Sequence, residues 1–177
     1  MSSRPISQEI PIVETERLIL RGHRPDDFEN CVALWADPVV TRYIGGKPFS
    51  AKEVWARLLR YVGHWALLGF GFWAAEDKVT GSFVGELGFA DFKRSIDPPL
   101  NMPELGWILA SHAHGKGYAT EAVRAAIGWG ERHFGPIQTT CIIDPENHPS
   151  LRVAEKCGYR EARRAIYKGQ PMIVFTR

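Results

Sequence analysis

Apolar residues recur along the chain with two different periods, and each change of period marks an expected element. Polar and apolar positions alternate over Arg17–Arg21, which predicts a first strand. Helical spacing follows over residues 26–36 and again over residues 50–68. Ser50 and Glu53 have the spacing of a capping box at the start of the second stretch. The front of the chain is therefore expected to form one strand and two helices.

The middle and the second half of the chain alternate strands with helices. Residues 71–76 and 82–92 indicate a hairpin, and a proline-rich surface loop over residues 93–102 separates it from a strand at Glu104–Ser111. Apolar residues then share one helical face from Ala119 to Phe134. The remaining expected elements are a strand over 137–143, a helix over 149–157, and strands over 161–167 and 172–176. This order predicts an α/β fold with a mixed sheet between helices.

Length and charge narrow the class of protein. The 177 residues are 45% hydrophobic and 24% charged, which predicts a single domain over residues 1–177. A net charge of +2 gives no reason to expect a nucleic-acid or membrane partner. The N-terminal segment, through Leu18, has no apolar run long enough for a signal peptide, and no membrane span follows. We therefore expect a cytoplasmic protein.

The cysteines and histidines do not suggest a metal site. Cys31, Cys141 and Cys157 are widely spaced, so we expect small buried side chains rather than disulfides or zinc ligands. His112 and His114 lie two residues apart beside glycines, with no third ligand nearby. No metal is predicted.

The segment His112–Ala122 combines an expected strand end, a glycine loop and a helix start. Such an arrangement directs unpaired backbone N–H groups and the positive end of a helix dipole at one point, where an anion can bind. The spacing of Gly115 and Gly117 fits neither a Walker loop nor a dinucleotide fingerprint, which leaves a short pyrophosphate site. Two glycines after a strand also form ordinary turns, so the glycines alone do not decide.

Several spaced motifs together resemble the GNAT superfamily of acetyl-CoA-dependent N-acetyltransferases, from about residue 15 to the C-terminus. The most similar branch includes the ribosomal-protein N-terminal alanine and serine acetyltransferases. The resemblance implies a mostly antiparallel twisted sheet of about seven strands, with a bulged strand that splays from its neighbour at the cofactor site. The motifs that carry it are Thr15–Arg21, Asp26–Asp27, Trp35–Pro38 with Tyr43, Glu104–Trp107, His114–Glu121, Asn147–Ser150 and Glu155–Tyr159.

By this resemblance, acetyl-CoA binds along the strand end, the glycine loop and the following helices. His112 stands where the family usually has Gln or Arg, so the contact made by that side chain is not expected here. Main-chain amides hold the pyrophosphate in the family. The implied cofactor-binding residues are Ile108, Leu109, Ala110, His114, Gly115, Lys116, Gly117, Tyr118, Ala119, Thr120, Asn147 and Ser150.

The resemblance also implies catalytic groups. Glu104 matches the family's proton acceptor and shares a strand face with Ile108, whose N–H would polarise the thioester carbonyl. Ala154 stands where many relatives have a tyrosine acid, which shifts that role to Ser150. Each assignment has an alternative: Glu104 as a solvated carboxylate at a strand end, with Glu86 and Asp91 as other bases, and Ser150 as a hydroxyl that completes the first helical turn.

The sequence leaves the acceptor open. An amine acceptor is implied, either a peptide N-terminus or a small molecule. Aromatic residues near the first two helices either line an acceptor cleft or form ordinary core: Trp35, Tyr43, Phe70, Phe72 and Trp73. A catalytically silent CoA-binding module and a nucleotide-binding protein are the alternative classes. A homodimer is plausible for this branch, and no residue decides it.

Overall fold

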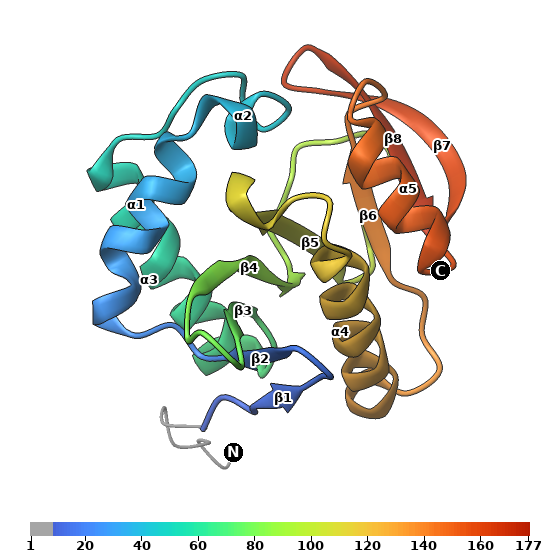
Figure 1. The fold of residues 1–177 in the computed structure, drawn as a ribbon. Coiled ribbons are helices and arrows are strands. Elements are labelled where there is room, and N and C mark those ends of the chain that lie inside the picture. Colours follow the sequence, from blue (N-terminus) through green and yellow to red (C-terminus); the bar gives the residue numbers. More distant parts are fainter. Residues whose placement is uncertain (1–8) are drawn as a thin grey trace.

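The protein folds around one eight-stranded sheet, described for residues 9–177 in a computed structural model (Figure 1). Residues 1–8 lie outside the described part, so the expectation of no signal peptide is untested there. The strand order is β1-β2-β3-β4-β5-β6-β8-β7. The strands are β1 Val13–Glu14, β2 Leu18–Arg21, β3 Phe72–Asp77, β4 Phe83–Ala90, β5 Glu104–Leu109, β6 Thr140–Ile143, β7 Arg160–Tyr167 and β8 Gln170–Thr176.

All neighbouring strands are antiparallel except β5 and β6, which are parallel. The predicted mixed, mostly antiparallel α/β fold is therefore confirmed, with eight strands where about seven were expected. The sequence reading missed β1. A strand of two residues is too short to produce a detectable alternation.

Within residues 9–177, five α-helices flank the sheet (Figure 1). They are α1 Phe28–Ala36, α2 Pro38–Thr41, α3 Ala51–Leu68, α4 Tyr118–Phe134 and α5 His148–Lys156. The capping box of α3 is confirmed, because the Glu53 carboxylate accepts from the Ser50 N–H at 2.8 Å and the Ser50 hydroxyl accepts from the Glu53 N–H at 3.4 Å. The short α2 was not predicted, because four residues are too few to show a helical period. Asp37 instead caps the new helix by accepting from the Val39 N–H.

Two groups of buried side chains fix the helices on opposite faces of the sheet. Residues of α4 and α5 pack with one face of the strands in the largest core cluster. Residues of α1, α2 and α3 form a second cluster, against which Ile108 packs from β5. The three cysteines are buried and free, as expected. Helices on both faces leave the strand ends as the place for a site.

Candidate functional site

The sheet opens between β5 and β6. These strands pair only at Glu104 and Thr140, where the Thr140 N–H donates to the Pro103 carbonyl at 3.0 Å. The rest of β5 pairs with β4 alone, in a regular register from Ala90–Glu104 to Gly85–Leu109. The splayed pair is therefore confirmed. The family's bulge in this strand is absent, because the β4–β5 register has no shift.

Strand alternation decides which backbone groups face the opening. The Ala110 N–H donates to the Val84 carbonyl of the β4 side at 2.9 Å. Because N–H groups two residues apart point the same way, the N–H of Ile108 also faces β4. The groups that face the gap belong to Trp107 and Leu109. The N–H of Ile108, which was expected to polarise a thioester carbonyl, therefore does not face the gap.

The glycine loop lies next to this opening and leads directly into α4. Gly115 and Gly117 have φ angles of 74° and 80°, a region that favours glycine. Gly117 is the N-cap of α4, and no side chain caps the helix. The first N–H with an intrahelical partner is that of Glu121, which donates to the Gly117 carbonyl. The N–H groups of Tyr118, Ala119 and Thr120 therefore remain available for an anion.

An ion pair that the sequence reading missed fixes this loop. Arg17, just before β2, donates to the Lys116 carbonyl at 2.8 Å and to the Glu121 carboxylate at 2.7 Å. Thr15 donates to the same carboxylate at 2.6 Å. Burial by itself would raise the pKa of Glu121, but these bonds outweigh it and leave the pKa lowered. The charge of Glu121, which would otherwise repel a phosphate, is thus neutralised by Arg17.

Two further contacts hold the loop in place. The Tyr118 hydroxyl donates to Asp77 at 2.7 Å, and together with the Thr80 N–H it lowers the pKa of Asp77 to about 2. The His114 ring lies 2.9 Å from the carbonyl of Leu109. His114 therefore connects the loop to the gap side of β5. Neither Arg17 nor Asp77 had a local signal, because both partners lie far away in the sequence.

Asn147 and Ser150 lie at the start of α5. The Asn147 side chain caps the helix by accepting from the Ser150 N–H at 3.2 Å. Its amide nitrogen remains available to a ligand. Among the described residues, none forms a hydrogen bond with the Ser150 hydroxyl. The capping role belongs to Asn147, and the hydroxyl of Ser150 is free to donate.

Glu104 is held by an arginine that the sequence reading did not single out. Arg94, in the loop after β4, donates to both Glu104 oxygens at 2.7 Å. The Glu104 side chain is 7% exposed. An ionised carboxylate offers about four lone-pair positions, so this two-bond contact leaves others for a water or an amine.

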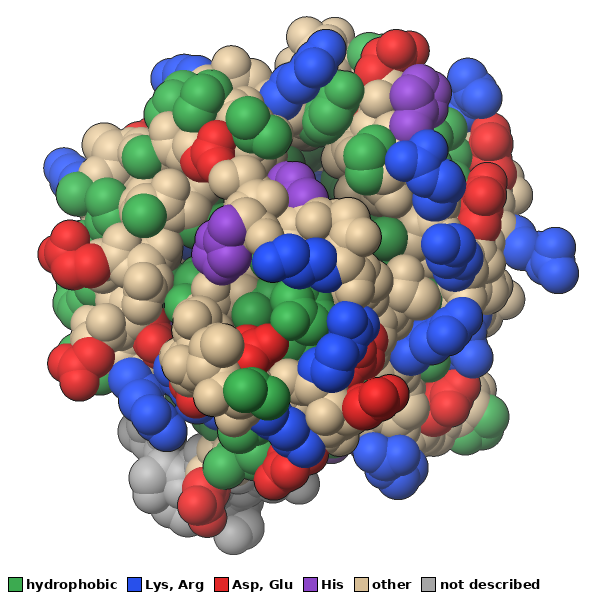
Figure 2. Space-filling view, viewed as in Figure 1, with side chains coloured by type: hydrophobic (Ala, Val, Ile, Leu, Met, Phe, Trp, Pro, Cys, Tyr) green, Lys and Arg blue, Asp and Glu red, His purple; other side chains and the backbone are tan. Residues whose placement is uncertain are grey.

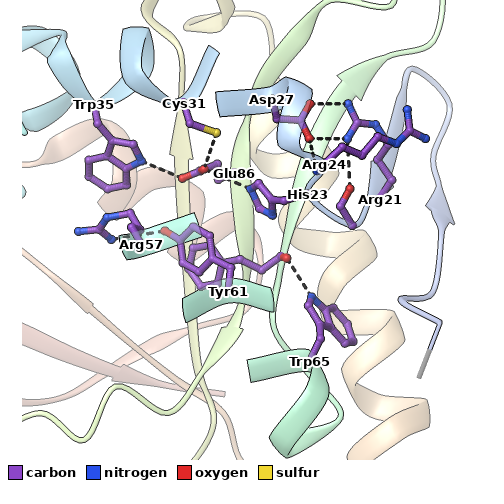
Figure 3. A network of polar contacts seen from close by, with 12 residues as sticks. Arg21, His23, Arg24, Asp27, Cys31, Trp35, Arg57, Tyr61, Trp65 and Glu86 are labelled. Carbon is purple, nitrogen blue, oxygen red and sulfur yellow. Dashed lines mark hydrogen bonds and ion pairs between the residues drawn. The ribbon is translucent and has the colours of Figure 1, made fainter. Parts of the chain in front are cut away.

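Glu86, the alternative base, lies opposite Ile108 on β4 and is fully buried. Figure 3 shows His23, Cys31 and Trp35 directed at its carboxylate. One oxygen contacts His23 and Cys31 at 3.2 Å each, and the other accepts from the Trp35 indole at 2.9 Å. Burial would raise the pKa of Glu86, but the bond and charge of His23, with the other donors, leave it lowered.

This network is the one group among residues 9–177 whose spacing would suit a metal, since its ligand atoms lie within 4.8 Å of one another. The hydrogen bonds already account for both Glu86 oxygens. Glu86 therefore joins α1 to the sheet. Three of its about four lone-pair positions are occupied, and the side chain is fully buried.

The aromatic residues fall mostly in the core. Trp35, Phe72 and Trp73 are buried, and Phe70 packs against Phe134 of α4. Tyr43 is half-buried, beside Arg42. Trp35, Phe72 and Trp73 are therefore ordinary core residues and do not line an acceptor cleft.

The surface is hollowed between α2 and the β7–β8 hairpin, and Lys and Arg side chains lie around the hollow (Figure 2). Acidic side chains are scattered between them (Figure 2).

No helix within residues 9–177 has the length and apolar character needed to cross a bilayer.

Known proteins resemble this chain over most of its length. Residues 17–160 match the family described as acetyltransferase (GNAT) domain. The protein YkkB of Bacillus subtilis (strain 168) is 39% identical over 169 residues, which cover 92% of this chain and 93% of YkkB.

Solved structures share the fold. A putative GNAT-family acetyltransferase from Bordetella pertussis has a TM-score of 0.83 and 29% identity, with 94% of this chain and 99% of that chain covered. A putative ribosomal-protein-serine acetyltransferase from Vibrio cholerae has a TM-score of 0.74, with 94% of this chain and 96% of that chain covered. At 23% identity, this second likeness concerns the fold alone.

Proposed function

We propose that this chain, which belongs to the GNAT acetyltransferase family, transfers the acetyl group of acetyl-CoA to a primary amine by direct attack on the thioester. One observation carries the proposal: the uncapped N-terminus of α4 lies next to a gap in the sheet with unpaired backbone groups. The helix N-terminus suits a diphosphate, and the exposed strand edge suits the extended pantetheine arm with its amides.

The residues present fit acetyl-CoA. The N–H groups of residues 118–120 would bind the diphosphate, and Gly115 leaves open space, since no atom lies within 4 Å of a Cβ built there. Trp107 and Leu109 would pair with the pantetheine amides. The free amide nitrogen of Asn147 would donate to the same arm.

A backbone N–H that faces the gap would polarise the thioester carbonyl. We assign this to Leu109 or Trp107 in place of Ile108, because the Ile108 N–H faces β4. Such a donor is worth about 2.7–4 kcal/mol where it has been removed in other enzymes.

Proton transfer would use Glu104 and Ser150. An amine must lose a proton in order to attack, and Glu104 has lone pairs that Arg94 does not occupy. The departing thiolate would take a proton from Ser150, whose hydroxyl has no partner among the described residues. Glu86 is not assigned a step, because it is fully buried and three donors already hold its carboxylate.

The test is release of free CoA thiol from acetyl-CoA over a panel of peptide N-termini and small primary amines. We expect amine-dependent release, with the acetylated amine confirmed by mass spectrometry. Tight binding of CoA with no turnover of any amine would instead establish a silent CoA-binding module.

A further inference from the structure

Two arginines of α3 are held on aromatic rings and lack an acidic partner. The guanidinium of Arg57 lies 3.9 Å from the centre of the Trp35 ring and 5.0 Å from that of Phe49. That of Arg60 lies 5.0 Å from the ring of Phe92. Among residues 9–177, no carboxylate oxygen lies within 4.0 Å of either cation.

The neighbouring charges do not compensate for them. Arg94 lies over the same Phe92 ring at 4.8 Å, but Glu104 already neutralises it. Glu53 lies one turn before Arg57. Bonds from Ser50 are the main cause of its lowered pKa, and the charge of Arg57 is a minor one. The pKa of Arg60 is lowered, first by partial burial and then by the charge of Arg57, although the side chain remains exposed.

Both arginines lie on the side of the sheet where the amine would approach. Ile108 packs against the cluster that contains Trp35 and also against the one that contains Tyr61. Arg57 donates to the Tyr61 hydroxyl at 3.4 Å, and Figure 3 shows it beside Trp35 and Tyr61, next to Glu86. Arg60 shares Phe92 with the Arg94–Glu104 pair. Both cations thus belong to the helix that packs on the Ile108 face of the sheet, and Arg60 shares an aromatic ring with the arginine that holds the proposed base.

We infer that the acceptor is a primary amine that also carries a carboxylate or phosphate group, and that Arg57 and Arg60 bind this anion. The inference rests on the proposed acetyl transfer. Arginine suits the role because its planar fork of donors matches carboxylate and phosphate oxygens, and stacking on aromatic rings holds the fork in a fixed direction. An anion placed there would also remove the unfavourable clustering of positive charge.

The experiment compares acceptors that differ only in charge. One set consists of tripeptides with an amidated C-terminus and aspartate, asparagine or lysine as the second residue, so that the side chain is the only possible anion. The other set consists of O-phosphoethanolamine and ethanolamine. We expect the KM of the anionic member of at least one set to be about tenfold or more below that of its neutral partner. The set in which this happens tells whether the anion comes from a peptide or from a small molecule.

Variants assign the effect to the arginines. The double variant Arg57→Gln/Arg60→Gln should raise the KM of the anionic acceptor about tenfold and leave that of the neutral acceptor unchanged. Arg60→Glu should reverse the preference, toward the lysine peptide. Arg132→Gln, an exposed arginine of α4, removes one positive charge far from the site and should leave both values unchanged.

The outcomes separate the two proposals. Turnover with equal KM for anionic and neutral amines, and no change in the double variant, would overturn the inference and leave acetyl transfer standing. Absence of turnover with every amine would overturn both. A double variant that unfolds shows a lowered Tm, and in that case the reversed preference of Arg60→Glu decides.

Discussion

The carboxylate of Glu104 is fixed by one arginine, and its use as a base depends on what that arginine leaves free. Arg94 approaches through two nitrogens and leaves lone pairs on both oxygens. The pair also keeps the carboxylate in one orientation, which favours proton transfer at a fixed point. Glu86 shows the contrast, because its three donors hold it as a structural contact between α1 and β4.

Glu104→Gln tests the base. At pH 7 we expect kcat to fall by about 10²–10⁴, the usual contribution of a general base. The loss should shrink as the pH rises past the pKa of the acceptor amine, near 8 for an α-amine, because that amine then loses its proton without help. The measurement is a pH–rate profile of both proteins.

Glu155→Gln serves as the control for this profile, because Glu155 is exposed on α5. An unchanged profile in Glu104→Gln would remove Glu104 from the mechanism.

Ser150→Ala separates an acid from a structural hydroxyl. Because Asn147 caps α5 through the Ser150 backbone, the substitution should leave the helix intact. We expect a lower kcat with unchanged CoA affinity, measured by steady-state kinetics and by titration calorimetry. Full kcat with weaker CoA binding would mean that the hydroxyl only contacts the cofactor.

Among elements, the N-terminus of α4 shows what a sequence can and cannot predict. Its glycine loop and its position after a strand are local, so spacing made an anion site one of two interpretations, and the family resemblance favoured it over an ordinary turn. The ion pair between Arg17 and Glu121 could not be predicted, because the two residues lie 104 positions apart in the sequence. The direction of the backbone N–H groups in β5 could not be predicted from the sequence either. It depends on which residues of β4 lie opposite, and a shift of one residue reverses it.

Arg17→Gln tests whether the ion pair between Arg17 and Glu121 holds the glycine loop in place. The variant loses the bonds to Lys116 and Glu121 and leaves the Glu121 charge beside the proposed phosphate site. We expect the Kd for CoA to rise about three- to tenfold, a modest effect because the Arg17 side chain is 42% exposed and water screens the pair. Isothermal titration calorimetry measures the change.

A second substitution, Glu121→Gln in the Arg17→Gln background, removes the uncompensated charge and should restore part of the affinity. Equal Kd values for the wild type and Arg17→Gln would show that the loop keeps its shape without the arginine.

In the whole molecule, the sheet consists of two halves that meet at one bridge. Strands β1 to β5 form one continuous antiparallel half, and β6, β8 and β7 form the other. Periodicity predicted the order of helices and strands in both halves, apart from the short β1 and α2. The gap between the halves was expected only from the family resemblance. Local periodicity indicates single strands and does not show which distant strands pair.

Acetyl-CoA is expected to stabilise the molecule by filling this gap and connecting the halves. At a concentration one hundred times its Kd it should add about 2.7 kcal/mol to the free energy of unfolding. For a chain of this size that corresponds to a rise in Tm of about 5–10 °C. ATP and NAD share the diphosphate but lack the pantetheine arm, so they should give a much smaller rise. Differential scanning fluorimetry measures all three, and amide hydrogen exchange should show new protection in β5 and β6 with acetyl-CoA alone. Equal stabilisation by ATP, without protection of these strands, would mean that the α4 site binds a nucleotide and that the gap is not used.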